Sequence, residues 1–324
     1  MKQLTITKPI RLIELFAGIG SQAMALRNIS ADFEKYIICE WQTSAIASYK
    51  AIHFEDDNTD YSKGKTKEEL ADILFNLGIS SNGKNALTRQ QIARKPEQWL
   101  RTTFNNIKAT NNLVNITKIT SADLKISETD KYTYILTYSF PCQDLSIAGK
   151  MAGMDKGAGT RSGLLWEVER LLNETRTLPQ ILLMENVPAV IGAKNEHNFK
   201  AWCDFLQSKG YKNHVQIMNA KDYGVAQNRK RAFMISIQGG YAFEFPEPIP
   251  LNKTINDYLE DEVDAKYYIP KEKTKDLIKE CEKSDIAKKQ ISNTIRRGGR
   301  RSLDRHSWDV IVEDEPDQTN RKLL

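Results

Sequence analysis

The sequence is poor in cysteine and histidine, with four of each scattered along 324 residues. No two cysteines form a CxxC pair, which argues against a zinc site and against a disulfide framework. No apolar run approaches the roughly eighteen residues that a membrane-spanning helix needs. We therefore expect a protein that binds no metal and does not enter a membrane.

The N-terminus also lacks the pattern of a signal peptide, because Arg11 and Glu14 interrupt its apolar run. A cytoplasmic location is the resulting expectation. The formal net charge of +5 and the pI near 8.8 are mildly basic. Such a charge is compatible with a polyanionic partner but does not require one.

Apolar strands alternate with helix-like stretches over the first 240 residues. This alternation predicts an α/β fold with a sheet of mostly parallel strands. We expect strands at 11–16, 36–39, 134–138, 180–184, 215–218 and 232–237, and helices at 22–29, 43–53, 161–172 and 199–209. Residues 58–110 are polar and rich in lysine, which indicates an insertion with some helix.

A change in composition after Gln238 indicates a domain boundary. Gly239 and Gly240 precede a cluster of prolines, a composition typical of a linker, and the chain beyond it is highly charged. We predict a catalytic and cofactor-binding domain over residues 1–240 and a smaller domain over residues 241–324.

A glycine-rich turn follows the first predicted strand. Gly18 and Gly20 belong to a G-x-G-x-x-A pattern that leads into a helix, where backbone N–H groups are free to bind a ligand. Glu40 ends the next strand about twenty residues later, where an acid can bind ribose hydroxyls. Trp41 adds an aromatic face. The pattern suits NAD, FAD or S-adenosylmethionine, and a purely structural turn is the alternative.

Two candidate catalytic side chains also follow strands. Cys142 comes just after a strand and a rigid proline, at the sheet edge where ligands bind in open α/β folds. A thiolate in that position is a nucleophile. Glu185 ends another apolar strand and could serve as an acid. For either residue alone, an ordinary structural role remains the alternative.

Basic side chains form three further candidate groups. Gln227, Arg229 and Arg231 alternate along an extended segment, so they share one side that suits phosphate or base contact. The segment 89–101 is basic as well. A third group surrounds Gly298 and Gly299 and could contact phosphates or guanines: Arg296, Arg297, Arg300 and Arg301. For each group a solvated basic surface is the alternative.

Seven motifs in order resemble those of the cytosine-C5 DNA methyltransferases, the bacterial members most closely. Together they span roughly residues 11–237. In chain order they are ELFAGIGSQ, ICEW, SADL, TYSFPCQDLS, GTRSGLLWEVERLL, LLMENVPAV and NAKDYGVAQNRKRAFMIS. The resemblance implies a Rossmann-like S-adenosylmethionine-dependent methyltransferase sheet with a smaller, shortened target-recognition region, and double-stranded DNA as the partner.

The resemblance also implies individual roles. Cys142 would be the nucleophile and Glu185 the acid, while Arg229 and Arg231 would bind the target cytosine and its phosphate. Gln227 would support their loop. The residues implied in the cofactor pocket are Phe16, Gly18, Ile19, Gly20, Glu40, Trp41, Asp123, Pro141 and Leu164.

Family members continue past the recognition domain into two more motifs, which are not found before Leu324. We therefore expect either a separate polypeptide that supplies them or a catalytically incomplete DNA-binding fragment. A tRNA cytosine-C5 methyltransferase is a further alternative, because a tRNA-modifying branch shares these motifs. A nicotinamide-dependent dehydrogenase explains the glycine turn but gives no role to Cys142 or Glu185.

Overall fold

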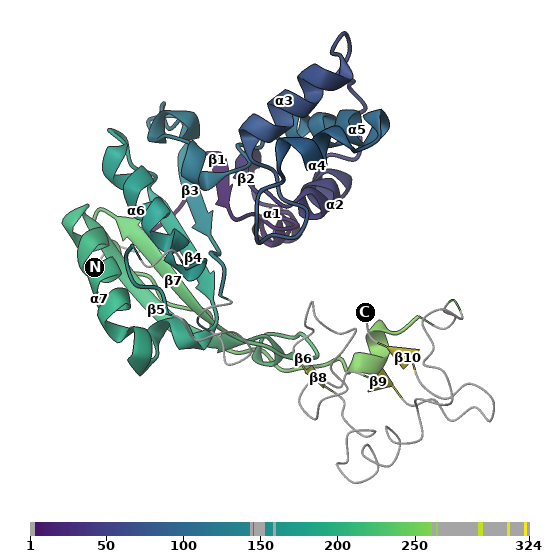
Figure 1. The fold of residues 1–324 in the computed structure, drawn as a ribbon. Coiled ribbons are helices and arrows are strands. Elements are labelled where there is room, and N and C mark those ends of the chain that lie inside the picture. The colour runs from purple at the N-terminus through teal and green to yellow at the C-terminus, as the bar shows by residue number, and fades with distance from the viewer. Residues whose placement is uncertain are drawn as a thin grey trace, which may run out of the picture. The chain divides into compact units, whose positions relative to one another are not determined.

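The computed structural model describes residues 4–142, 145, 153–157, 160–260, 264, 291–293, 310–311 and 321–322. The chain divides into two compact units (Figure 1). The first comprises Met1–Gln216 and Ala232–Glu244, and the second comprises Ile217–Arg231 and Phe245–Leu324.

A six-stranded sheet is the centre of the first unit, with the strand order β2-β1-β3-β4-β7-β5. Strands β1 to β4 pair in parallel, and β7 runs antiparallel to β4. The prediction of an α/β fold with a mostly parallel sheet is therefore confirmed. The strands are β1 (Ile10–Leu15), β2 (Phe33–Cys39), β3 (Thr133–Tyr138), β4 (Ile181–Asn186), β5 (Tyr211–Asn219) and β7 (Lys230–Gln238).

Alternate residues of the strands face two separate cores. Ile13 and Leu15 of β1 join the main core, whereas Leu12 joins a second cluster on the opposite face. Helices α6 (Leu165–Glu174) and α7 (Glu196–Ser208) cover the main core, and α1 (Ser21–Asn28) covers the second. A sheet covered on both faces explains why its central strands are almost continuously apolar.

The insertion between β2 and β3 folds as a small group of helices beside α2 (Thr43–His53) (Figure 1). Its helices are α3 (Lys67–Leu77), α4 (Arg89–Ala93) and α5 (Glu97–Ala109). Thr66 and Thr88 begin the first two with capping boxes. Apolar residues from the three helices form a separate core, which includes Leu70, Leu74, Ile92, Leu100 and Phe104. We name residues 54–115 the helical insert.

Short 3-10 helices connect the longer elements. Within the first unit they are η1 (Ile116–Lys118), η2 (Ser121–Leu124), η3 (Ser162–Leu164), η4 (Pro188–Ile191) and η5 (Ala193–Asn195). In the part of the chain that the structure describes, no helix is long and apolar enough to cross a membrane.

The second unit contains the loop between β5 and β7. Its elements are η6 (Ala220–Asp222), β6 (Gln227–Asn228), η7 (Ile255–Tyr258), β8 (Ser292–Asn293), β9 (Val310–Ile311) and β10 (Arg321–Lys322). Strand β6 pairs in parallel with β8, and β9 pairs antiparallel with β10. The main-chain N–H of Ile249 also donates to the carbonyl oxygen of Asp222.

Several element boundaries differ from the sequence prediction. Strand β1 ends one residue early, because Phe16 has a positive φ of 59° that turns the chain. Strands β2 and β5 begin earlier than predicted, at Phe33 and Tyr211. Both lie at edges of the sheet, where half-exposed residues do not show the apolar pattern of a central strand.

Candidate active site

The glycine turn joins the ends of β1 and β2. The N–H groups of Phe16 and Ala17 donate to the carbonyl oxygen of Cys39 over 2.8 and 3.3 Å. Phe16, Gly18 and Gly20 all have positive φ angles, which reverse the chain before α1 begins. Positive φ is easily adopted by glycine and strained for Phe16. The turn therefore has a fixed shape beside the end of β2.

The two glycines of the turn serve different purposes. A Cβ atom added to Gly20 would lie 2.3 Å from Nε2 of His53 and 2.6 Å from Cε2 of Tyr49. A Cβ atom added to Gly18 would meet no described atom within 4 Å. Gly20 is therefore required by the packing of α2, whereas Gly18 borders open space that a ligand could enter.

Glu40 links the turn to the chain that leaves β2. Its carboxylate accepts hydrogen bonds from the N–H groups of Gly18, over 2.9 Å, and Gln42, over 2.7 Å. The side chain is half-buried. Carboxylate oxygens have further lone pairs, so Glu40 can still accept hydrogen bonds from ribose hydroxyls. The next residue, Trp41, is half-buried and packs against the core of the helical insert.

The remaining residues assigned to the cofactor lie on several elements. Asp123 of η2 is half-buried, and its Oδ2 accepts from the N–H and the hydroxyl of Thr120 over 2.8 and 2.9 Å. Leu164 packs against the main core, and Ile19 is 55% exposed. Pro141 is half-buried, and its carbonyl oxygen accepts a hydrogen bond from the hydroxyl of Ser162 over 2.8 Å.

The segment that carries Cys142 begins where β3 ends. Cys142 is half-buried, and its carbonyl oxygen accepts from the N–H of Leu145 over 3.0 Å. The side chain of Gln22, just after the glycine turn, donates to the hydroxyl of Ser139 over 3.1 Å. The cysteine segment is therefore tied to the start of α1.

Glu185 lies at the end of the neighbouring parallel strand, β4. It is half-buried, and the adjacent Asn186 donates from its amide to the carbonyl oxygen of Phe140 over 3.0 Å. The register pairs Tyr138 with Met184, so both chains pass the end of the sheet at the same level. Cys142 and Glu185 therefore follow adjacent strands at one edge of the sheet.

The three cysteines in the described part of the chain differ in environment. Cys39 is buried in the main core, and burial raises its thiol pKa far above the ordinary value. Burial likewise raises the pKa of Cys203 to about 11, which suits a packing role. Only Cys142 of these three follows a strand at the edge that also carries Glu40 and Glu185.

A buried acid beside the turn was missed by sequence reasoning. Glu14 of β1 is 1% exposed and accepts hydrogen bonds from the hydroxyl of Tyr49 and the N–H of Ala23. Burial raises its pKa to about 7. Tyr49 packs on His53, whose Nε2 lies 3.0 Å from the carbonyl oxygen of Ile19. An acid within an otherwise apolar strand was the available signal.

The basic residues of the loop after β5 lie in the second unit. Gln227, Arg229 and Arg231 are all half-buried, while Asn228 and Lys230 between them are exposed, as the alternation predicts. The main-chain groups of Arg229 bond to Asn219 and Ala220, which fixes the loop. The other predicted DNA-binding residues lie outside the described residues: Arg296, Arg297, Arg300 and Arg301.

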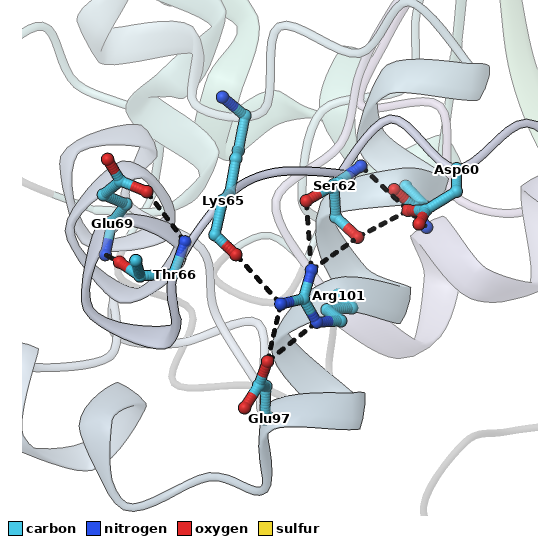
Figure 2. Close-up of polar contacts among 8 residues, drawn as sticks. Asp60, Ser62, Lys65, Thr66, Glu69, Glu97 and Arg101 are labelled. Atoms are coloured by element: carbon cyan, nitrogen blue, oxygen red, sulfur yellow. Dashed lines mark hydrogen bonds and ion pairs between the residues drawn. The ribbon is translucent and has the colours of Figure 1, made fainter.

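Arginines of the basic segment 89–101 contact the protein itself. Figure 2 shows the guanidinium group of Arg101, which donates to Glu97, to the carbonyl oxygen and hydroxyl of Ser62, and to the carbonyl oxygen of Lys65. Arg89 forms an ion pair with another side chain of the insert, Asp72. For these two arginines the structure favours a role in stabilising the insert.

Comparisons with known proteins identify the family of this chain. The sequence matches the family model described as C-5 cytosine-specific DNA methylase over residues 10–76 and 74–322. Orphan methyltransferase M.SssI of Spiroplasma monobiae is 41% identical over 262 residues, which cover 79% of this chain and 67% of that protein. Type II methyltransferase M2.ScrFI of Lactococcus lactis subsp. cremoris is 35% identical over 271 residues, covering 82% and 72%.

A solved structure shares the fold. The Dnmt2 methyltransferase of S. pombe superimposes with a TM-score of 0.59 and 16% identity, covering 98% of this chain and 83% of that one. At this low identity the likeness concerns the fold alone, whereas the family match extends over most of the sequence. The chain therefore belongs to the family of C-5 cytosine-specific DNA methylases.

Proposed function

We propose that this protein transfers a methyl group from S-adenosylmethionine to carbon 5 of a cytosine in DNA, with Cys142 as the nucleophile. One observation carries the proposal. The neighbouring parallel strands β2, β1, β3 and β4 end at one edge of the sheet. In that order, their ends carry Glu40, the glycine turn, the Cys142 segment and Glu185. Hydrogen bonds join these strand ends to one another. In open α/β sheets, ligands bind at this edge.

The residues at the first two strand ends fit the cofactor. Gly18 leaves open space at the turn, and Glu40 retains acceptor capacity for ribose hydroxyls. When bound, S-adenosylmethionine supplies an electrophilic methyl group on a sulfonium. We assign the surrounding contacts to Phe16, Ile19, Gly20, Trp41, Asp123, Pro141 and Leu164.

Cys142 and Glu185 divide the chemistry on the cytosine ring. The thiolate of Cys142 forms a bond to carbon 6, and the ring electrons move toward carbon 5 and N3. Glu185 stabilises that charge by holding a proton at N3. Carbon 5 then bonds to the methyl carbon while the bond between that methyl group and the cofactor sulfur breaks, leaving its electron pair on sulfur. A base removes the proton from carbon 5, and the bond between carbon 6 and Cys142 breaks to release the thiolate. All of this requires the cytosine to leave the duplex.

The second unit contributes contacts to DNA in this proposal. Arg229 and Arg231 bind the target cytosine and its phosphate, and Gln227 supports their loop. Guanidinium groups suit such contacts because they donate several hydrogen bonds in one plane. Arg296, Arg297, Arg300 and Arg301 are assigned to phosphates or guanines on the basis of sequence.

The assignment of the nucleophile predicts the effect of two cysteine substitutions. Cys142→Ser should abolish methyl transfer to duplex DNA, since a hydroxyl is a far weaker nucleophile than a thiolate. Cys203→Ser is the matched control and should retain activity, because Cys203 lies in α7 and packs against the main core. Formation of 5-methylcytosine is measured by mass spectrometry.

The same assay separates the alternatives. Turnover by Cys142→Ser would show that another group is the nucleophile. Methyl transfer to tRNA but not to duplex DNA would replace the proposed substrate. A wild-type protein that binds DNA but no S-adenosylhomocysteine in calorimetry would indicate a binding module instead of an enzyme.

A further inference from the structure

We propose that the helical insert positions Glu40 and Trp41 for the cofactor, and that Asn112 is the positioning residue through which it does so. The inference rests on the proposed function, because it assigns a purpose to the support of a cofactor site. Asn112 lies 72 positions from Glu40 in the sequence, and no motif includes it.

The side-chain amide of Asn112 forms hydrogen bonds with both main-chain polar groups of Glu40. The N–H of Glu40 donates to Oδ1 of Asn112 over 3.0 Å, and Nδ2 of Asn112 donates to the carbonyl oxygen of Glu40 over 2.9 Å. Oδ1 also accepts from the N–H of Val114 over 2.8 Å. Asn112 is 7% exposed, so these bonds form away from water. They therefore fix the main chain from which the Glu40 carboxylate projects.

The amide of Asn112 acts as an extension of the sheet. Strand β2 lies at the sheet edge, and Ile38 pairs with Asn112 through a single parallel bridge. Leu113 donates from its N–H to the carbonyl oxygen of Ile38 over 2.9 Å. Two residues later the strand has ended, and the side-chain amide pairs with Glu40 as a peptide group would. Buried main-chain groups need such partners.

Ser80 holds the residues that follow from another part of the insert. Its N–H donates to the carbonyl oxygen of Trp41 over 2.7 Å, and its carbonyl oxygen accepts from the N–H of Thr43 over 2.8 Å. Ser80 is fully buried, and its hydroxyl donates to the carbonyl oxygen of Asn85. Two separate segments of the insert therefore hold consecutive residues of the chain that leaves β2.

With the main chain held in this way, the Glu40 carboxylate can serve both the glycine turn and a ribose. It already accepts from the N–H groups of Gly18 and Gln42. Trp41 is fixed in addition by packing on the insert core. Preorganised groups bind a ligand more tightly because less freedom is lost on binding. Loss of the Asn112 amide should therefore weaken cofactor binding more than it slows the reaction at saturation.

The test compares Asn112→Ala with a matched control one residue earlier. Asn111 also donates from its side-chain amide to β2, reaching the carbonyl oxygen of Tyr36 over 2.6 Å. Because Asn111 has a φ of 47°, Asn111→Gly removes that bond without backbone strain. Asn111→Gly loses a side-chain bond to β2, whereas Asn112→Ala loses the side-chain bonds to Glu40, which follows that strand.

We expect Asn112→Ala to raise the KM for S-adenosylmethionine roughly tenfold with little change in kcat. This pattern is expected because the lost interaction stabilises the bound ground state and the transition state equally. The Kd for S-adenosylhomocysteine in calorimetry should rise by a similar factor. Asn111→Gly should leave both constants unchanged even where it lowers Tm. If Asn112→Ala does not fold, Asn112→Asp replaces the donor to Glu40 with an oxygen that repels the Glu40 carbonyl, and should raise KM and Kd in the same direction.

The outcomes distinguish this inference from the proposed function. Wild-type protein that binds no S-adenosylhomocysteine would overturn both. Wild-type binding with an unchanged Kd in the Asn112 variants would overturn the inference alone. Equal increases of KM in Asn112→Ala and Asn111→Gly would also overturn it, because they would show general loosening of the sheet edge.

Discussion

At the scale of single residues, the charged groups nearest the glycine turn have two different environments. Glu40 is half-buried and takes N–H donors from both sides, an arrangement that stabilises a carboxylate. Glu14 lies deep beneath the turn, where burial favours its protonated form and raises its pKa to about 7. Glu40 therefore belongs to the proposed cofactor site, whereas Glu14 supports the turn through Tyr49 and Ala23.

The raised pKa of Glu14 predicts a pH dependence of stability. The unfolded chain loses the proton near pH 4.5, whereas the folded protein keeps it until about pH 7. The contribution is therefore fully present below pH 4.5 and is lost as pH rises through about 7, on the order of 3 kcal/mol in total. Urea unfolding at pH 5 and pH 8 measures this loss.

Glu14→Gln supplies the comparison for that measurement. It keeps a polar side chain of the same size but does not titrate, so its free energy of unfolding should fall less between pH 5 and pH 8. His53 has a lowered pKa, which makes the free energy of unfolding rise with pH, opposite to the effect of Glu14. Because His53 is present in both proteins, its contribution cancels in the comparison. Equal pH dependence of the two proteins would contradict the role given to Glu14.

At the scale of elements, we expect the two glycines of the turn to be needed for different reasons, Gly20 for packing and Gly18 for ligand binding. Gly20→Ala should lower the free energy of unfolding by about 3 kcal/mol, through the strain of its positive φ and the crowding of buried Tyr49 and His53. Gly18→Ala should cost only about 1 kcal/mol, from its positive φ, but should weaken binding of S-adenosylhomocysteine. Chemical unfolding and calorimetry on both variants test this difference. Similar stability losses in the two would show that the contact with α2 is unimportant.

The helical insert is stabilised by hydrogen bonds from Arg101, and we compare their loss with the loss of the Arg89 ion pair. Arg101→Ala removes the hydrogen bonds that Arg101 makes to Ser62 and Lys65 at the start of the insert and to Glu97 of α5, and should lower the free energy of unfolding by about 2 kcal/mol. Arg89→Ala, which breaks the more exposed pair with Asp72, should cost less than about 1 kcal/mol. DNA affinity should be unchanged in both variants. A large loss of DNA affinity in Arg101→Ala would indicate that Arg101 contacts DNA.

At the scale of the whole molecule, the residues with proposed functions are divided between the two units. The glycine turn, Glu40, Cys142 and Glu185 belong to the first unit, and Gln227, Arg229 and Arg231 belong to the second. Cofactor binding and DNA binding should therefore respond to different substitutions. The prediction that a separate polypeptide supplies further motifs stays a prediction. An assay of this chain with and without a polypeptide encoded beside it would test it.

This division predicts the behaviour of the loop after β5. Arg229→Ala should weaken DNA binding and reduce the salt slope of log K by about 1, as expected when one phosphate contact is lost. Its affinity for S-adenosylhomocysteine should be unchanged. Lys230→Ala is the control, because Lys230 is exposed between the half-buried arginines. Titration of labelled duplex at several salt concentrations measures the slope, and equal effects of the two substitutions would contradict the assignment.

The mostly parallel sheet, the family and the residue types at the strand ends could all be predicted from the amino-acid sequence. Strands β1, β3 and β4 are apolar runs, and α2 has the predicted bounds, because local hydrophobic pattern is sufficient for buried elements. The ordered motifs then indicated the methyltransferase family, which the comparisons confirm. The individual site residues remain predictions.

The residues that support those strand ends could be identified only from contacts within the folded chain. The roles of Glu14, Gly20, Ser80, Arg101 and Asn112 come from contacts with residues distant in sequence, and the local pattern around each does not show those contacts. An asparagine beside an edge strand could face water or pair with that strand. Its place is fixed by the packing of the insert against β2, because the partner of a buried polar group depends on the folded chain around it.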